Sequence, residues 1–433
     1  MAAYDSYKDS GVKWLGKVPS HWEVKKLRST FFEVKELNSN RQTSNQLQFK
    51  FGTIISKPDC SVDTDVWTTI EKYTVVKPND IIINGLNLNF DLLSMRVGQV
   101  KDLGAITSAY VCLRPKNNIF SSYFLYLLKG MDARKVFHGF GSGIRATLSF
   151  KELKNKELAI PPREEQEAIV SYLDNVTAKI DEAIEAQQKM IDALNERKQI
   201  IITRAVTKGL NPDAPLRDSG IDWLGQIPAH WEIKKLKMLS EIKGRIGFRG
   251  YTNDDLVESG EGAITLSPSN IKNGKMDYSY CSYLSWFKYE ESPEIKVQNG
   301  HILFVKTGSS YGKTAFVENL PMEATINPQF SLIKPISVNP VFLNYAISST
   351  YFSLQVEKGV IGSTIPTISQ NTIKNFIVLL PPIEEQHKIV DSLKVKLNYI
   401  DNIISICENK ISLLQERKQI IINEVVTGKK KVI

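Results

Sequence analysis

Residues 9–27 read DSGVKWLGKVPSHWEVKKL, and residues 218–236 read DSGIDWLGQIPAHWEIKKL. Thirteen of these nineteen positions are identical, and three more exchange Val for Ile. We call the two copies the start motifs. Two later motifs also recur: PPREEQ at 161–166 returns as PPIEEQ at 381–386, and ERKQIII at 196–202 returns unchanged at 416–422. Internal repetition on this scale indicates that one structural unit is built twice.

The offset between the copies locates an insertion. It grows from 209 residues at the start motifs to 220 at the later motifs, so the second copy carries eleven extra residues. Pro78–Ile83 already aligns with Gln298–Leu303 at the larger offset, which places the insertion between about residues 236 and 298. Each half therefore has the same frame around a middle that differs in sequence. This arrangement suggests one mounting that presents two different binding surfaces.

The segments after the Pro-Pro pairs have the pattern of a coiled coil. Seam positions recur there at alternating spacings of three and four over four heptads, and charged residues fill the other faces. The seam positions are apolar except for Thr177 and Gln187 in the first segment. We expect two helices of about 40–45 residues, or about 60–68 Å, ending at Gly209 and Gly428. The predicted seam residues are Val170, Leu173, Ile180, Ile184, Ile191 and Leu194 in the first helix, and Val390, Leu393, Leu397, Ile400, Ile404, Ile411 and Leu414 in the second.

The order of the elements predicts how these helices pair. The first helix leads from the first half of the chain into the second half. The second helix has the same apolar seam, and the sequence offers no third helix of this kind for it to pack against. If the two pack together, they run antiparallel and the halves are related by an approximate two-fold axis. Gln187 and Cys407 then occupy equivalent seam positions, as a polar residue that sets register and a small buried thiol. A redox role for Cys407 is the other interpretation.

The two middles are rich in short strands interrupted by Gly, Asn and Pro, which indicates an α+β fold with a mostly antiparallel sheet. The predicted strands are Tyr73–Lys77, Ile81–Asn84, Tyr110–Leu113, His301–Lys306 and Phe330–Lys334, with short helices at Ser122–Leu128 and Val341–Ile347. The predicted fold class is thus two pseudo-two-fold-related α/β domains joined by two long antiparallel coiled-coil helices. The predicted boundaries are 1–160, 161–210, 211–380 and 381–433.

The composition favours a basic protein of the cytoplasm. The 433 residues carry a formal net charge of +8, which suits a polyanionic partner such as DNA. A basic protein without a nucleic-acid role is the other interpretation. No CxxC pair, N-terminal signal sequence or long apolar run occurs, so we expect no zinc ribbon, no secretion and no membrane span.

Several glycine-containing loops carry side chains that can pair with bases or phosphates. Arg and Lys suit guanine, Asn and Gln suit adenine, and basic or aromatic residues among glycines suit close approach to phosphates. For each such residue, a solvated loop position is the competing interpretation. The candidates are Asn84, Asn87, Asn89, Arg96 and Arg145 in the first half, and Arg245, Arg249, Tyr251, Lys306, Ser309, Ser310, Tyr311 and Lys313 in the second, with Gly362–Thr364 as a further loop.

No catalytic site or metal site is predicted. Gly308–Thr314 resembles a P-loop, but it has three residues between its glycines where a P-loop has four. The interpretation of the chain as a nucleotide-dependent enzyme therefore rests only on an incomplete P-loop motif. His21 and His230 belong to the start motifs, which favours a structural role over a catalytic one. The chain is expected to recognise a partner and to leave the chemistry to other proteins.

Taken together, the chain resembles the specificity subunits of type I restriction–modification systems (HsdS). The residues that carry the resemblance are the duplicated start motifs, the two PPxEEQ turns and the two ERKQIII segments. The segments at 84–100 and 308–315 also resemble parts of that family's target-recognition domains. The resemblance covers the whole chain, and these motifs are specific when they occur together in duplicate.

The resemblance implies a non-catalytic subunit of a bacterial or archaeal complex. Each middle would be a target-recognition domain reading one half of a bipartite DNA site, and the helices would set the unread gap. Two methyltransferase subunits carrying S-adenosylmethionine would direct N6-adenine methylation. Two motor–nuclease subunits using ATP and magnesium would restrict DNA. This chain itself would hold no cofactor. The alternative is a two-domain protein-interaction scaffold without DNA specificity.

The four tryptophans of the start motifs, Trp14, Trp22, Trp223 and Trp231, also admit two interpretations. Aromatic rings can stack on bases. However, residues that select a sequence have no reason to match in both halves while the rest of each domain differs. We therefore expect the start motifs to fasten each domain to the coiled coil where the helix from the other half ends.

Overall fold

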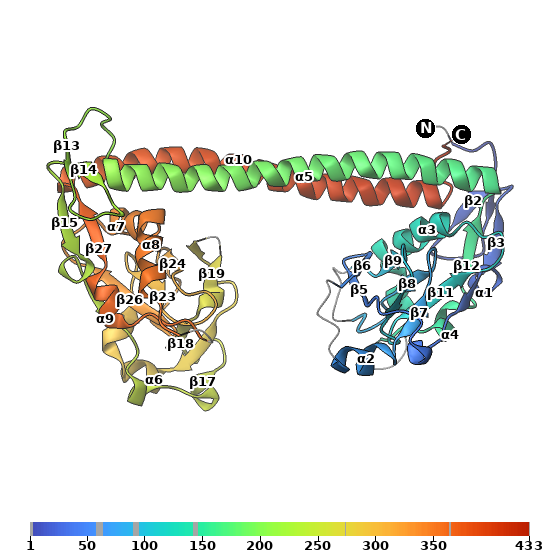
Figure 1. Ribbon diagram of the computed structural model, residues 1–433, viewed down its shortest axis with the longest axis horizontal. Coiled ribbons are helices and arrows are strands. Elements are labelled where there is room, and N and C mark those ends of the chain that lie inside the picture. The colour runs from blue at the N-terminus through green and yellow to red at the C-terminus, as the bar shows by residue number, and fades with distance from the viewer. Residues whose placement is uncertain are drawn as a thin grey trace. The chain divides into compact units, whose positions relative to one another are not determined.

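The chain divides into two compact units in the computed structural model, which describes residues 3–57, 64–89, 95–141, 146–272, 274–362 and 365–432. Unit 1 comprises Met1–Gln188 and Glu408–Ile433, and unit 2 comprises Lys189–Cys407. Each unit contains one strand-rich domain and part of two long helices, α5 (Arg163–Lys208) and α10 (Ile383–Val426) (Figure 1). The predicted fold class is confirmed.

Both domains are built on the same antiparallel arrangement of four strands. In unit 1 the strand order is β4 (Phe31–Glu33), β11 (Val111–Pro115), β8 (Ile81–Ile83) and β9 (Val97–Gln99). In unit 2 the corresponding order is β16 (Ser240–Lys243), β26 (Phe330–Pro335), β23 (Ile302–Val305) and β24 (Thr314–Phe316). Unit 2 extends this sheet by β20 (Lys275–Met276) and β19 (Ile271–Lys272). Both added strands lie in the interval where the sequence places the insertion.

Smaller sheets and short helices complete each domain. Unit 1 has the pairs β7 (Thr74–Val76) with β10 (Gly104–Ile106) and β5 (Leu47–Lys50) with β6 (Thr53–Ser56), besides α1 (Leu27–Thr30), α2 (Thr64–Ile70), α3 (Ser121–Ala133) and α4 (Phe150–Leu153). Unit 2 has a five-stranded sheet, ordered β17 (Leu256–Val257), β21 (Ser282–Ser285), β18 (Gly262–Leu266), β25 (Ala324–Ile326) and β22 (Lys296–Val297). Its helices are α6 (Trp286–Glu290), α7 (Pro340–Ile347), α8 (Thr350–Gly359) and α9 (Gln370–Asn375).

The start motifs join each domain to a long helix. In unit 1 the hairpin β1 (Tyr7–Asp9) and β2 (Lys17–Pro19) is followed by β3 (Glu23–Lys26), which pairs with β12 (Glu157–Ile160). Unit 2 repeats this with β13 (Leu216–Asp218), β14 (Gln226–Pro228), β15 (Glu232–Lys235) and β27 (Ile377–Leu380). In both units, the end of the start motif therefore pairs with the strand that leads into a long helix.

Within each unit, α5 and α10 pack against each other in opposite directions (Figure 1). In unit 1, Asp181 in the first half of α5 lies 2.6 Å from the ammonium group of Lys418 in the second half of α10. In unit 2, Lys198 and Asp401 form the corresponding ion pair. All thirteen predicted seam residues are buried or half-buried, as are Gln187 and Cys407.

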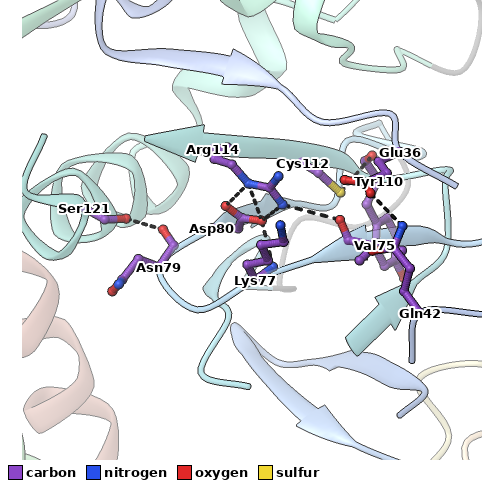
Figure 2. A network of polar contacts seen from close by, with 10 residues as sticks. All are labelled: Glu36, Gln42, Val75, Lys77, Asn79, Asp80, Tyr110, Cys112, Arg114 and Ser121. Atoms are coloured by element: carbon purple, nitrogen blue, oxygen red, sulfur yellow. Dashed lines mark hydrogen bonds and ion pairs between the residues drawn. The ribbon is translucent and has the colours of Figure 1, made fainter. Parts of the chain in front are cut away.

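An ion pair between buried Asp80, just before β8, and half-buried Arg114, on β11, joins the two inner strands of the unit 1 sheet, as Figure 2 shows. The Asp80 carboxylate accepts bonds of 2.9 and 2.7 Å from the Arg114 guanidinium. It also accepts a bond of 2.9 Å from the Lys77 amide. At the positions 220 residues later, unit 2 has Gly300 and Lys334. The two domains therefore share strand order but not this contact.

Candidate nucleic-acid interface

One tryptophan of each start motif, Trp22 or Trp231, packs against the end of a long helix. Gly428, just after α10, has a φ of +70°, and a Cβ there would lie 3.2 Å from the Trp22 ring. Gly209, just after α5, has a φ of +73°, and a Cβ there would lie 3.3 Å from the Trp231 ring. Glycine suits both positions because of the left-handed backbone and the close approach of the ring. Trp22 and Trp231 are buried, so the packing interpretation holds for them and base stacking does not.

The start-motif histidines contact the glutamates of the PPxEEQ turns. His21 Nε2 lies 2.8 Å from Glu165 Oε2, and His230 Nε2 lies 2.7 Å from Glu385 Oε2. Tyr4 also donates its hydroxyl to Glu165. These contacts tie the start motif to the first turn of a long helix in each unit. They support the predicted structural role of both histidines.

In unit 1, the loop after β8 lies against the segment that ends at residue 148. The Leu148 amide donates to the Gly85 carbonyl over 2.9 Å, and the Leu88 amide donates to the Ala146 carbonyl over 3.4 Å. A Cβ at Gly85 would lie 2.1 Å from the Leu148 oxygen. Glycine at position 85 therefore permits the two segments to meet.

Unit 2 brings the corresponding segments together. The Gly308 amide donates to the Pro366 carbonyl over 3.1 Å, and the Ile368 amide donates to the Lys306 carbonyl over 2.8 Å. Gly308 and Pro366 stand 220 residues after Leu88 and Ala146. The variable loops of the two domains thus meet at equivalent places. We call these assemblies the loop clusters: residues 85–88 with 146–148 in unit 1, and residues 306–308 with 361–362 and 365–368 in unit 2.

The loop candidates differ in exposure. Asn87, Asn89, Ser309 and Lys313 are exposed, whereas Asn84, Arg249, Tyr251, Lys306, Ser310 and Tyr311 are half-buried. Arg145 lies outside the described residues, as do Ser363 and Thr364. Arg249 Nη1 lies 3.3 Å from Glu294 Oε2, so one of its protons is already used within the domain.

Two predicted DNA contacts need correction. The side chains of Arg96 and Arg245 are buried, at 1% and 7% exposure. Arg96 donates to the backbone carbonyls of Leu86 and Asn84 over 2.8 and 3.1 Å. Arg245 donates to the Ile326 carbonyl over 3.2 Å. A guanidinium group that is enclosed and bonded in this way is not presented to a base edge, so the predicted direct contacts are withdrawn.

Lys306 has a different environment. Its amide donates to the Gln329 carbonyl over 2.8 Å and its carbonyl accepts from Ile368, so its backbone is held on both sides. A Cβ at Gly244 would lie 3.4 Å from its ammonium nitrogen. Burial lowers the pKa of Lys306, and within the described chain no ion pair is found for it. Its charge is available to an anion.

The P-loop-like segment is a hairpin connection. The Val305 amide donates to the Lys313 carbonyl over 2.8 Å, and the Gly312 amide donates to the Val305 carbonyl over 2.8 Å. Strand β24 follows at once, whereas a P-loop leads into a helix whose N-terminus holds phosphate. The nucleotide-site interpretation is therefore wrong. In the described part of the chain, no group of three or more His, Cys, Asp or Glu residues could hold a metal ion. No helix in the same ranges is long and apolar enough to cross a membrane.

Sequence reasoning missed an apolar component of the unit 2 loop cluster. Ile361 and Ile365 are 69% and 63% exposed. Ile361 exchanges two backbone hydrogen bonds with Thr367, and Thr307 pairs with Thr367 across the cluster. Apolar side chains can contact the methyl group of thymine. The only sequence signal is the position of these residues beside Gly362, because the pairing with Thr307 is set by tertiary structure.

Comparisons with known proteins agree with this architecture. The family described as "Type I restriction modification DNA specificity domain" matches residues 19–191 and 228–415. The MjaVIII specificity subunit of a type I restriction enzyme of Methanocaldococcus jannaschii is 26% identical, covering 98% of this chain and 97% of that protein. The EcoKI specificity subunit of Escherichia coli strain K12 is 23% identical, covering 95% of this chain and 90% of that protein.

A solved structure shows the shared fold. It comes from work on complex assembly and conformational transition of the type I R-M system, and its TM-score to this chain is 0.64 at 14% identity. The match covers 94% of this chain and 98% of the other. The family match includes both domains and most of both long helices. This chain therefore belongs to the type I restriction modification DNA specificity domain family.

Proposed function

We propose that this chain is the DNA-specificity subunit of a type I restriction–modification complex. Each domain reads one half of a bipartite, asymmetric site, and the chain performs no catalysis by itself. The observation that carries this proposal is the pair of loop clusters. The repeated scaffold places loops of different sequence at equivalent positions in the two domains. Each domain can therefore present a different surface to its own half-site.

The long helices would set the gap between the half-sites. α5 is a single helix of 46 residues and α10 one of 44. Ion pairs and a buried apolar seam hold the helices together within each unit. A paired helix keeps its length, because its backbone hydrogen bonds fix the rise at about 1.5 Å per residue. The number of heptads would therefore fix the number of unread base pairs.

The chemistry would come from partner subunits. We propose two methyltransferase subunits that carry S-adenosylmethionine and methylate adenine, and two motor–nuclease subunits that use ATP and magnesium. This chain would hold no cofactor, and the complex would act in the cytoplasm. The names of the relatives support a specificity role within such a system. The exposed Asn87 and Asn89 of unit 1 and the available charge of Lys306 in unit 2 are the polar groups that we assign to DNA.

A binding measurement on the assembled complex tests this proposal against the scaffold alternative. The complex of this chain with its methyltransferase subunits is titrated with duplex libraries at several salt concentrations. We expect enrichment of a bipartite sequence and weaker binding as salt rises, because counterions are released from phosphates. Binding without sequence enrichment, or without salt dependence, would support the scaffold instead. The Lys306→Met variant should lower the salt slope by about one, and Lys237→Met, exposed outside the loop cluster, serves as its control.

A further inference from the structure

We propose that Arg96 and Arg245 are positioning residues that set the shape of the recognition loop in their own domain, and thereby its sequence discrimination. Neither side chain would touch DNA. This inference rests on the proposed function, because discrimination between bases is the property that it explains. It goes beyond that function because it makes one buried side chain in each domain responsible for how strongly that domain discriminates against mismatched bases in its half-site.

In unit 1, Arg96 lies beneath the loop that follows β8. Its guanidinium group donates to the carbonyls of Asn84, Leu86 and Asn87 over 3.1, 2.8 and 3.4 Å. Its own amide donates to Asp132 Oδ2 over 2.7 Å, which anchors the arginine to helix α3. Three carbonyls within four consecutive residues thus converge on one side chain. This contact fixes the peptide planes from which the side chain of Asn87 projects.

The held loop has a backbone that needs support. Asn87 has a φ of +51°, in the left-handed region that costs a non-glycine residue free energy. Its neighbour Leu86 is bonded through its amide to the side chain of Asn84, and Leu88 through its amide to Ala146. These two contacts satisfy backbone amides of the loop, whereas Arg96 donates hydrogen bonds to its backbone carbonyls. Without them, the exposed Asn87 side chain would sample more than one direction.

In unit 2, Arg245 performs the equivalent task with different partners. It donates to the carbonyls of Ile326 and Arg249 over 3.2 Å each, and to Thr325 Oγ1 over 3.1 Å. Its guanidinium carbon lies 5.1 Å from the centre of the Tyr251 ring. The first and last parts of the 245–251 loop are thereby tied to strand β25. In each domain, a buried arginine therefore bonds to the backbone of a loop that carries candidate DNA contacts, Asn87 in unit 1 and Arg249 and Tyr251 in unit 2.

Arginine is suited to this role by its shape. Its planar guanidinium group presents several N–H donors in a fixed fork, whereas lysine has one compact ammonium group on a flexible chain. A lysine at either position retains the charge but cannot reach all the acceptors at once. Substitution with methionine removes the donors and leaves buried carbonyls without partners, which is costly and allows the loop to move.

The test measures discrimination at each half-site separately. The complete complex is assembled with wild-type chain, Arg96→Met or Arg245→Met, and its methylation rate is compared on the cognate duplex and on duplexes with one mismatch in either half. One mismatch is ordinarily worth roughly tenfold or more in specific DNA binding. We expect Arg96→Met to reduce discrimination about tenfold at the unit 1 half-site only. Arg245→Met should do the same at the other half-site.

Two Arg→Lys variants provide a matched comparison in unit 1. Arg96→Lys keeps the charge and loses part of the fork, so it should broaden the same half-site to a smaller degree. Arg114→Lys makes the same substitution at an arginine that pairs with Asp80 and not with the loop, and it introduces the residue that unit 2 has at position 334. It should leave discrimination unchanged. If Arg96→Met does not yield a soluble complex, Arg96→Lys decides the question.

Several results would overturn the proposal. These are unchanged discrimination in a folded Arg96 variant, equal broadening at both half-sites, and broadening by Arg114→Lys. Failure of the proposed function looks different, because the wild-type complex would then prefer no bipartite sequence. In that case hydrogen exchange at the Leu88 amide still reports on the loop. Faster exchange in Arg96→Met than in Arg114→Lys is expected, and equal exchange contradicts the bracing role.

Discussion

Trp231 donates its indole N–H to Glu385 Oε2 over 3.1 Å. The same glutamate contacts His230, and Trp231 also packs against Gly209 at the end of α5. One aromatic side chain thus links the start motif, the first turn of α10 and the last turn of α5 within unit 2. In unit 1, Trp22 occupies the matching place, but no acceptor for its indole N–H is found among the described residues. There, Tyr4 donates to the glutamate instead.

This difference between the two copies predicts unequal effects of the same substitution. Trp→Phe removes similar packing at both sites, but only Trp231→Phe also removes a hydrogen bond. We expect Trp231→Phe to lower the free energy of unfolding by about 1 kcal/mol more than Trp22→Phe. Denaturant-dependent hydrogen exchange, read separately in each unit, measures both. Equal losses would show that the bond to Glu385 contributes nothing measurable.

The Asp80–Arg114 pair predicts a non-additive pair of substitutions. Arg114→Met leaves the carboxylate of Asp80, which is 1% exposed, buried without its partner. Breaking such a pair typically costs about 3–5 kcal/mol, and the partial exposure of Arg114 places the expected loss at the low end. The double variant Asp80→Asn/Arg114→Met should be more stable than Arg114→Met alone, as measured by denaturant unfolding. Simple additivity of the two single losses would contradict this account.

His301 predicts an acid-sensitive unit 2. Burial, with a smaller contribution from Lys334, lowers the pKa of His301 from 6.5 to about 4. Its Nδ1 accepts a hydrogen bond of 3.0 Å from the Gln298 amide, which requires the unprotonated nitrogen. The unfolded chain therefore binds a proton more readily than the folded chain, and stability present above pH 6.5 is lost as the pH falls toward 4.

Ile81, the matching residue of unit 1, supplies the control. His301→Ile should remove this part of the pH dependence. Between pH 7.5 and pH 4.5, the unfolding midpoint of the variant should therefore fall less than that of the wild type. The midpoints are compared by thermal unfolding in matched buffers. Parallel pH profiles for the two proteins would show that His301 makes no contribution.

Periodic and repeated features could be predicted from the sequence, whereas contacts set by tertiary structure could not. The heptads from Val390 to Leu414 predicted a helix because apolar residues recur at the spacing that places them on one face of a helix. The five predicted strands overlap β7, β8, β11, β23 and β26. In contrast, Arg96 and Arg245 have the residue type of a DNA contact, and Arg245 also stands among glycines. Only the fold shows that carbonyls surround them, because those acceptors belong to the backbone and leave no mark in the sequence.

The coiled coil predicts a quantitative change in the DNA gap. Deleting Asp181–Gln187 together with Ser412–Lys418 removes one heptad from each helix, including the Asp181–Lys418 ion pair, and keeps the seam in phase. Seven residues correspond to about 10 Å of helix, or about three base pairs of B-DNA. The motif of the deletion variant should have a correspondingly shorter unread gap and unchanged half-sites. An unchanged gap in a folded complex would rule out the helices as its determinant.

The most direct test of independent recognition exchanges one domain. Residues 28–157 are replaced by the matching region of another specificity subunit, and the methylated motif of the resulting complex is determined by sequencing modified DNA. We expect one half of the bipartite motif to change, while the other half and the gap are retained. A motif that changes in both halves, or that does not change at all, would contradict it.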